Sequence, residues 1–342
     1  MSTPGTETHE TPSGPVVDAC SLVYDNDSWR AYLNRFRHNA PEYLDVFSRS
    51  FCRYFGVDHT GYRDALARCW DDAMAYLVPA TRTNLDLPSY LDGRASESVI
   101  AEIAMGGSAE VAPGESVNDR LLALTATHRE RIQMWAGISL IDTGAALSEL
   151  SRSLAAGATG ICIIPFLDGI DITDPVHTPV IGAAEDAGLP LWLHTGHHFA
   201  ASQPPGAGNW RAVDELARRH PRLVIVAGHA GWPDVTEMLL TASRHSNVLL
   251  EFSSHRARTM RTPGAGWEIL LAQAGSLGRG RVMFGTSTWV NPTPVRDLVA
   301  EVRDLGLDPT ITQEWLAATA QSLMQRSITY EPGDTAPRQS RT

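Results

Sequence analysis

Leu189-Pro-Leu-Trp-Leu193, which runs into His194-Thr-Gly-His-His198, and Leu223-Val-Ile-Val-Ala227, which runs into Gly228-His229, are the most informative stretches of this chain. Each apolar run is too short for a helix and is bounded by Pro or Gly, which is typical of a buried parallel strand. Each run ends beside a histidine, and α/β folds build their sites at the carboxyl ends of such strands. We therefore expect His194 and His229 to share one site.

Strand-like and helix-like segments alternate on both sides of this pair. No GxGxxG, GxxxxGKS/T or GxSxG motif stands at a strand-to-helix turn, which argues against Rossmann, P-loop and α/β-hydrolase folds. Eight strands in β–α alternation favour an α/β fold closed as a (β/α)8 TIM barrel. The strands are predicted over residues 15–22, 99–105, 132–140, 160–164, 189–194, 223–227, 247–252 and 281–284, and helices over 145–156, 178–187, 210–219, 235–244, 266–274 and 294–305.

An aromatic-rich stretch precedes the second strand. Its aromatic residues recur mostly at spacings of three or four, which is typical of helices. We interpret this stripe as helical core, with a substrate-capping role as the alternative; it comprises Trp29, Tyr32, Phe36, Tyr43, Phe47, Phe51 and Tyr54. The sequence thus predicts an N-terminal helical insertion over residues 28–96, in which 81–96 form a connector. A single barrel domain is predicted over 15–329, between disordered tails at 1–14 and 330–342.

The composition limits the partners and the compartment. A net charge of −11 over 342 residues argues against nucleic acid and anionic membrane surfaces, and leaves a small molecule as the expected partner. With no apolar run of about 18 residues and no signal-peptide core, neither a membrane span nor secretion is expected. The four cysteines form no CxxC pair, which favours a reducing cytoplasm. All 28 basic residues are arginine, so a lysine Schiff base and a carbamylated lysine are excluded.

The residues around the predicted strand ends follow an order that resembles a known family. The segments are Val117-Asn-Asp119 with Arg131, Gly188-Leu-Pro-Leu-Trp-Leu-His-Thr-Gly196, Gly228-His-Ala-Gly-Trp-Pro233, Asn247-Val-Leu-Leu-Glu251 and Arg281-Val-Met-Phe-Gly-Thr286. Together they resemble the amidohydrolase superfamily, in the branch of aminocarboxymuconate-semialdehyde decarboxylase and related non-oxidative decarboxylases. The resemblance implies a distorted (β/α)8 barrel, and a homodimer would be ordinary for this family.

Three positions depart from the metal-binding pattern of that family. Its first strand ends in His-x-His or a carboxylate variant, whereas this chain has Cys20 and Leu22 there. Ser287 stands where the family has an aspartate that binds metal or carries a proton. Leucine cannot coordinate a metal, and neutral serine is a poor ligand. We expect a site without a metal; if a divalent metal such as zinc is bound, the resemblance and ligand chemistry point to Cys20, His194 and His229 as its ligands, with an inert core cysteine as the alternative for Cys20.

Acid–base chemistry does not depend on that metal. The ordinary pKa of histidine, about 6.5, suits His194 and His229 to proton transfer near neutrality. Glu251, near the end of strand 247–252, is the third catalytic candidate. Substrate-binding candidates, each with a packing or solvated role as the alternative, are His197, His198, His255, Trp232, Trp289, Ser287 and Cys20. Arg256, Arg258 and Arg261 follow the same strand and are interpreted as surface residues, with carboxylate binding as the alternative.

These residues lead to one functional hypothesis and two alternatives. We expect an amidohydrolase-related enzyme that cleaves a small polar or aromatic substrate, by hydrolysis, with His229 as the proton carrier and His194 orienting or polarising the substrate. Non-oxidative decarboxylation is the alternative within enzymes, because the decarboxylase branch has the closest motif order. An inert barrel that serves as a binding protein is the alternative outside enzymes, because three ligand positions are altered.

Overall fold

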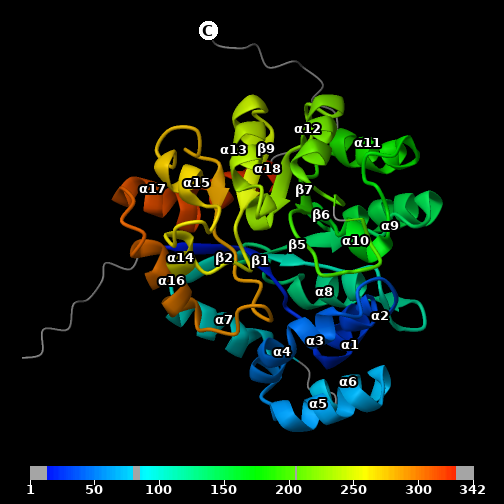
Figure 1. Ribbon diagram of the computed structural model, residues 1–342. Helices are drawn as coiled ribbons and strands as arrows, with labels where there is room; N and C mark the ends of the chain where they lie inside the picture. Colours follow the sequence, from blue (N-terminus) through cyan, green and yellow to red (C-terminus); the bar gives the residue numbers. More distant parts are fainter. Residues whose placement is uncertain (1–13, 80–84, 205, 329–342) are drawn as a thin grey trace, which may run out of the picture.

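Eight parallel strands form one sheet in the order β1-β2-β5-β6-β7-β8-β9-β10 (Figure 1). The computed structural model describes residues 14–79, 85–204 and 206–328, so the tails predicted at 1–14 and 330–342 lie outside the described residues except for Gly14. The eight predicted strands are all present, as β1 (Val16–Ser21), β2 (Val99–Met105), β5 (Ile132–Gly137), β6 (Gly160–Ile163), β7 (Leu191–His194), β8 (Ile225–Gly228), β9 (Val248–Glu251) and β10 (Val282–Met283).

The first and last strands meet and close the sheet into a barrel. The backbone N–H of Ala19 donates to the carbonyl oxygen of Phe284 at 2.9 Å, and the N–H of Ser287 donates to the carbonyl oxygen of Cys20 at 2.9 Å. A closed sheet has no exposed edge, and its strand ends converge on a single mouth. The predicted (β/α)8 barrel is thus confirmed.

Helices surround the barrel and pack on it through their apolar faces (Figure 1). Two of them have the predicted bounds, α12 (Trp210–Arg219) and α13 (Val235–Arg244), and four differ by at most two residues at each end from their predictions. Those four are α9 (Thr143–Ala156), α11 (Thr178–Asp186), α15 (Glu268–Ala272) and α16 (Val295–Arg303). No helix within the described ranges is both long enough and apolar enough to cross a bilayer.

Several elements differ from the sequence-based expectation. Residues predicted as a connector form the helix α7 (Leu87–Ser96), which begins with Pro88 in its first turn, where proline does not interrupt a helix. The sequence also failed to predict several short or weakly periodic helices and strands, because these segments lack a long amphipathic pattern. They are β3 (Glu110–Ala112), β4 (Glu115–Ser116), α8 (Val117–Thr125), α10 (Pro165–Asp168), η1 (Pro175–His177), η2 (His229–Gly231), α14 (Ala257–Met260), α17 (Pro309–Gln313), the π-helical turn η3 (Glu314–Ala318) and α18 (Thr319–Ile328).

The N-terminal insertion is helical, as predicted. Its helices, blue to cyan in Figure 1, gather on one side of the barrel. They are α1 (Asn26–Asn34), α2 (Phe36–Asn39), α3 (Tyr43–Val46), α4 (Ser48–Phe55), α5 (His59–Arg68) and α6 (Trp70–Leu77), and α7 completes the insertion.

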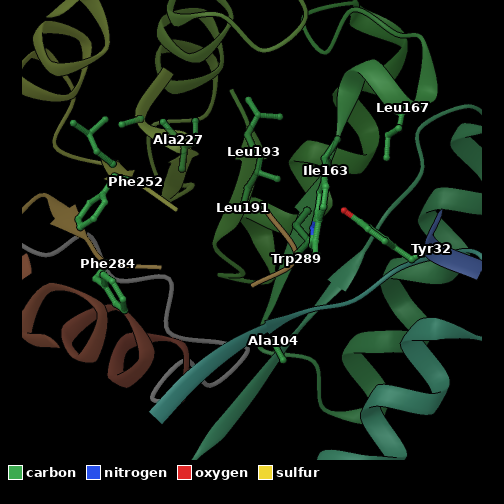
Figure 2. Close-up of a cluster of buried hydrophobic side chains, with 14 of the residues drawn as sticks. Tyr32, Ala104, Ile163, Leu167, Leu191, Leu193, Ala227, Phe252, Phe284 and Trp289 are labelled. Atoms are coloured by element: carbon green, nitrogen blue, oxygen red, sulfur yellow. The ribbon is translucent and has the colours of Figure 1, made fainter. Parts of the chain in front are cut away.

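Apolar side chains fill both faces of the closed sheet. One set packs between strands and helices, and Figure 2 shows part of it, with Leu191, Leu193 and Phe252 among the labelled side chains. A second set fills the barrel interior, where Trp135 and Trp192 pack with residues of α18. Burial on both faces explains why the strands are continuous apolar runs rather than alternating ones.

A buried polar network joins the strands at the barrel seam. The Asp18 carboxylate of β1 accepts hydrogen bonds from the Thr286 N–H at 2.9 Å and from the Thr286 hydroxyl at 2.6 Å. Arg94 of α7 forms ion pairs with Asp18 and, at 3.2 Å, with Glu102 of β2. The Tyr90 hydroxyl donates to Glu102 at 2.8 Å. Because the Asp18 side chain is fully buried, its charge depends on these partners.

The Arg94→Met substitution tests how much this network contributes to the free energy of unfolding. The substitution leaves two buried carboxylates without their cation, and we expect it to lower the free energy of unfolding by about 3–5 kcal/mol. Arg37→Met is the matched control, because Arg37 pairs with Asp71 on the exposed surface and such pairs contribute about 1 kcal/mol or less. Urea unfolding of both variants measures the difference, and equal losses would contradict a special role for the seam network.

Candidate active site

A cavity of about 230 Å³ lies at the carboxyl ends of the strands, under the insertion. The barrel and the insertion both contribute to its wall. Most of the site residues predicted from the sequence lie on this wall, namely Cys20, His194, His197, His229, Trp232, His255, Ser287 and Trp289. The structure therefore brings together residues from β1 and β7 and from the segments that follow β7, β8, β9 and β10, which are far apart in the sequence.

The insertion supplies much of the aromatic wall. Tyr32, Phe36, Tyr43 and Phe47 all line the cavity. The ring of Trp289 lies 5.1 Å from that of Phe47 between centroids, so the insertion and the barrel meet through aromatic contacts. The sequence predicts helical core for this aromatic stripe, with a substrate-capping role as the alternative, and these four residues both pack in the core and line the cavity. Helical spacing alone cannot distinguish a face that covers a core from one that covers a cavity.

His229 is held in a defined orientation by the loop after β9. Its Nδ1 lies 3.0 Å from the carbonyl oxygen of Ser253 and 3.1 Å from the Ser253 hydroxyl oxygen. A carbonyl oxygen only accepts, so these contacts assign the proton to Nδ1 and leave Nε2 unprotonated. Among the described residues nothing is hydrogen-bonded to this Nε2, and His229 lines the cavity. The arrangement presents a basic nitrogen to whatever occupies that space.

Glu251 lies behind His229 rather than on the cavity wall. The Ser253 hydroxyl donates to the Glu251 carboxylate at 2.9 Å, and the indole N–H of Trp192 donates to it at 3.2 Å. The Ser253 backbone N–H is a further donor. Burial raises the pKa of Glu251 from its ordinary value of 4.5 to about 7, although these hydrogen bonds oppose the shift. Ser253 thus connects His229 to a carboxyl group that titrates near neutrality.

Ser253 did not emerge from the sequence as a candidate. A small polar residue after a strand carries no periodic or motif signal. Its role arises at the end of β9, where Ser253 contacts His229 through its carbonyl oxygen and donates through its hydroxyl to Glu251, two residues earlier. Trp192 reaches the same carboxylate because Gly228 leaves room for it; a Cβ at Gly228 would collide with the indole.

Burial keeps the histidines of the site neutral. The rings of His194 and His229 lie 4.8 Å apart between centroids, at an angle of 74°. Burial lowers the pKa of His194 well below its ordinary value, and the neighbouring His229 lowers it further. Burial likewise lowers the pKa of His229 to about 4 and that of His255 to about 3. All three are therefore available as neutral imidazoles at pH 7, as a general base requires.

The backbone is strained where the strands end. Four residues other than glycine adopt left-handed conformations there, with φ of 65° at His229, 52° at Ala230, 69° at Ser254 and 44° at Ser287. Such conformations cost roughly 1–3 kcal/mol each and collect at functional sites. Three of these residues line the cavity, so the strain coincides with the side chains that a bound molecule would meet.

His198 and the three arginines after β9 lie away from the cavity wall. The His198 ring stacks on Phe166 at 5.0 Å, and its Nε2 lies 3.0 Å from the carbonyl oxygen of Pro204. Arg256 pairs with Glu301, Arg258 approaches the same carboxylate at 3.7 Å, and Arg261 bonds the backbone of Asp304. These contacts place the four side chains against neighbouring helices and loops.

The donor set at the mouth does not fit a metal centre. Within the described ranges, no three His, Cys, Asp or Glu side chains are arranged to hold an ion. Burial, followed by the charge of Glu251, raises the pKa of the Cys20 thiol well above its ordinary value, which disfavours the thiolate that a metal requires. Leu22 and Ser287, which line the same cavity, add no further strong donor.

Comparisons with known proteins agree with the barrel. The family model described as Amidohydrolase matches residues 58–320. No curated protein matches the chain. An uncharacterised TIM-barrel protein from Bordetella bronchiseptica superimposes with a TM-score of 0.64 at 18% identity, covering 92% of this chain and 99% of that one.

Other similar structures are decarboxylases. A 5-carboxyvanillate decarboxylase from Novosphingobium aromaticivorans, with bound manganese, has a TM-score of 0.58 at 14% identity and covers 92% of this chain and 98% of its own. A dihydroxybenzoic acid decarboxylase from Polaromonas, also with bound manganese, has a TM-score of 0.55 at 14% identity and covers 79% of this chain and 96% of its own. At these identities the similarity shows a shared fold.

The shifted pKa of Glu251 predicts a pH-dependent stability. Folding raises the pKa of Glu251 from 4.5 to about 7. The stabilising contribution of Glu251 to the free energy of unfolding is therefore fully present below about pH 4.5 and is lost as the pH rises through about 7. Glu251→Gln has no such loss, so its free energy of unfolding relative to wild type should improve by roughly 3 kcal/mol between pH 4.5 and pH 8.

Urea unfolding at a series of pH values measures that difference, and the histidine titrations common to both proteins cancel in it. Glu237→Gln, at an exposed position of α13, is the matched control and should show no such trend. A difference between Glu251→Gln and wild type that stays constant with pH would contradict the assignment of a raised pKa to Glu251.

The donor set also predicts the metal content. Protein purified without chelator should contain far less than one equivalent of zinc or manganese per chain, and EDTA should leave its melting temperature unchanged, because the mouth lacks a third strong ligand. The triple variant Cys20→His, Leu22→His, Ser287→Asp supplies that missing set and is expected to gain zinc. One zinc or manganese per wild-type chain in elemental analysis would refute the prediction.

Proposed function

The chain belongs to the amidohydrolase family, and we propose that it is a hydrolase that cleaves a small aromatic substrate by acid–base chemistry, with His229 as the proton carrier. The observation that carries this proposal is the orientation of His229. Its Nδ1 is bound by Ser253, and its unprotonated Nε2 belongs to a side chain on the cavity wall. A positioned imidazole of this kind is the commonest general base in enzymes.

Proton transfer follows from the same contacts. Nε2 of His229 takes a proton from a water molecule as that water attacks the electrophilic carbon of the substrate. The imidazolium that forms keeps its Nδ1–H bonded to Ser253, which is in turn bonded to the Glu251 carboxylate. Nε2–H then returns the proton to the leaving group, so that the base is regenerated. Glu251 and Ser253 are positioning residues here, since neither carboxylate nor hydroxyl needs to touch the substrate.

His194 is proposed to orient or polarise the substrate. Its ring lies beside both His229 and Phe166, at centroid distances of 4.8 Å and 4.7 Å. Its pKa is lowered well below the ordinary value by burial, so it contributes a neutral dipole rather than a charge. This assigns different tasks to two histidines that are equivalent in the sequence pattern.

Decarboxylation is the second candidate, supported by the decarboxylases among the similar structures. It requires a substrate with a carboxylate. The described residues on the cavity wall include no arginine to receive that group, and they do not fit a metal. Two observations argue against the inert-barrel alternative. The backbone is strained at the barrel mouth and the pKa of Glu251 is shifted there, and both features are typical of catalytic sites.

A turnover screen tests the proposal. The full chain is incubated with a panel of neutral aryl esters, lactones and aryl amides, and product release is followed. For any compound that is hydrolysed, His229→Ala should lower kcat/KM by roughly 10²–10⁴-fold while circular dichroism shows that the protein stays folded, because the general base is lost. His198→Ala is the matched control, since that ring lies away from the cavity wall, and it should keep its turnover.

The other outcomes separate the alternatives. Full activity in His229→Ala would refute the assigned proton carrier. Release of carbon dioxide from hydroxybenzoates, without hydrolysis of any ester, lactone or amide, would replace hydrolysis by decarboxylation. Binding of panel compounds without turnover of any kind would favour the inert barrel.

A further inference from the structure

The wall of the cavity carries no fixed charge. Among the described residues that line it, none is Asp, Glu or Arg, and the sequence contains no lysine. Its titratable groups are histidines, tyrosines and thiols, and burial favours the neutral form of His194, His229, His255, Tyr32 and Cys20. The rest of the wall is aromatic or aliphatic apart from small polar groups.

The cations close to this region are already paired. Arg35, whose charge acts on Tyr32, forms a 2.8 Å ion pair with Asp168. Arg94 is bound by Asp18 and Glu102, and Arg256 by Glu301. A carboxylate that entered the cavity would lose its hydration without gaining a cation, which is unfavourable by several kcal/mol. The cavity therefore discriminates against anions.

Among the described residues, one hydroxyl group of the insertion lies at the cavity wall without a hydrogen-bond partner. Tyr32 of α1 lines the cavity and is 7% exposed, yet among the described residues its hydroxyl has no hydrogen-bond partner. Other buried tyrosines differ: the hydroxyl of Tyr24 donates to Met105 at 2.7 Å, and that of Tyr62 donates to Leu44 at 2.9 Å. Buried hydroxyls are nearly always bonded, so an unpaired one on a cavity wall points to a ligand atom as its partner.

The position and the protonation state of the Tyr32 hydroxyl also suit it to donate a hydrogen bond to a ligand. Figure 2 shows the Tyr32 oxygen pointing away from the ribbon of the insertion and toward the barrel. Burial raises the pKa of Tyr32 far above neutrality; Arg35 opposes this, while Cys20, Tyr43 and Cys162 reinforce it. Cys20 and Cys162 belong to the barrel part of the wall, so the Tyr32 oxygen lies within electrostatic reach of the cavity floor. It is a hydrogen-bond donor over the whole physiological pH range.

We propose that this cavity takes an uncharged aromatic compound that bears a carbonyl or other neutral acceptor oxygen, and that the Tyr32 hydroxyl donates a hydrogen bond to that oxygen. The inference rests on the proposed function, because it assumes that the cavity beside His229 is the active site. It adds the class of substrate that this cavity binds. Tyr32 is a specificity-determining residue here: the aromatic wall accepts the ring, and the hydroxyl selects the compounds that carry an acceptor. A compound without the oxygen leaves the Tyr32 hydroxyl unpaired, and an anion meets no cation.

Binding of three one-ring probes to the full chain tests this at pH 7. Acetophenone has the ring and a neutral acceptor, toluene has only the ring, and benzoate has the ring and a charge. Affinities are measured by quenching of tryptophan fluorescence, because Trp192, Trp232 and Trp289 line the cavity. Acetophenone should bind more tightly than toluene, and benzoate more weakly than either.

Tyr32→Phe removes the hydroxyl and keeps the ring. We expect it to weaken acetophenone binding by about 3- to 10-fold and to leave toluene binding unchanged, which matches the loss of one hydrogen bond. Tyr62→Phe is the matched control in the same insertion, because its hydroxyl is bonded to Leu44 and lies away from the cavity wall. It should leave the affinities for all three probes unchanged.

The opposite results would overturn the inference. Benzoate binding as tight as acetophenone binding would contradict a cavity for uncharged compounds, as would failure of both neutral probes to bind at millimolar concentration. Equal weakening of acetophenone and toluene in Tyr32→Phe would show a packing effect and remove the role of the hydroxyl. These readouts are equilibrium affinities, so they stand even if the turnover screen fails and the proposed hydrolysis is wrong.

Discussion

Asp18 connects the first strand to the end of the last one, and the site depends on that connection. Its carboxylate accepts hydrogen bonds from the backbone N–H and the hydroxyl of Thr286, and it pairs with Arg94, which also pairs with Glu102 of β2. With the seam closed, Cys20 and Ser287 come next to each other through a backbone hydrogen bond, and both reach the cavity wall. A barrel without this seam would leave its two end strands unpaired and its mouth without a defined shape.

Desolvation determines the protonation states of the buried groups at the barrel mouth. The same burial that lowers the pKa values of His194 and His229 raises those of Glu251 and Cys20, so each of these four groups is shifted toward its neutral form. A neutral imidazole with a free Nε2 is a competent base, whereas a protonated thiol is a poor metal ligand. Burial therefore keeps the imidazole of His229 in the unprotonated form of a base and keeps Cys20 in the thiol form, which disfavours metal binding. The aromatic side chains of the insertion contribute to that burial, because they line the same cavity as the two histidines.

Much of the fold and part of the site could be predicted from the sequence. The apolar runs before His194 and His229 indicated buried parallel strands, and the alternation around them indicated the barrel, because hydrophobic periodicity reports burial directly. The helix α7, the hairpin of β3 and β4 and the C-terminal helices were missed, since their residues are organised by contacts with distant segments. The aromatic stripe of the insertion indicated helices correctly, but its spacing could not show that Tyr32 and Phe47 face a cavity.

The sequence by itself determined the order of the strands along the chain and the positions of the two histidines at strand ends. These are properties of residue type and local spacing. Only the tertiary structure decided that Ser253 orients His229, that Glu251 lies behind the site, and that the Tyr32 hydroxyl has no partner among the described residues. Such roles depend on which distant side chains share a small buried volume, and the closure of the barrel and the docking of the insertion create that volume.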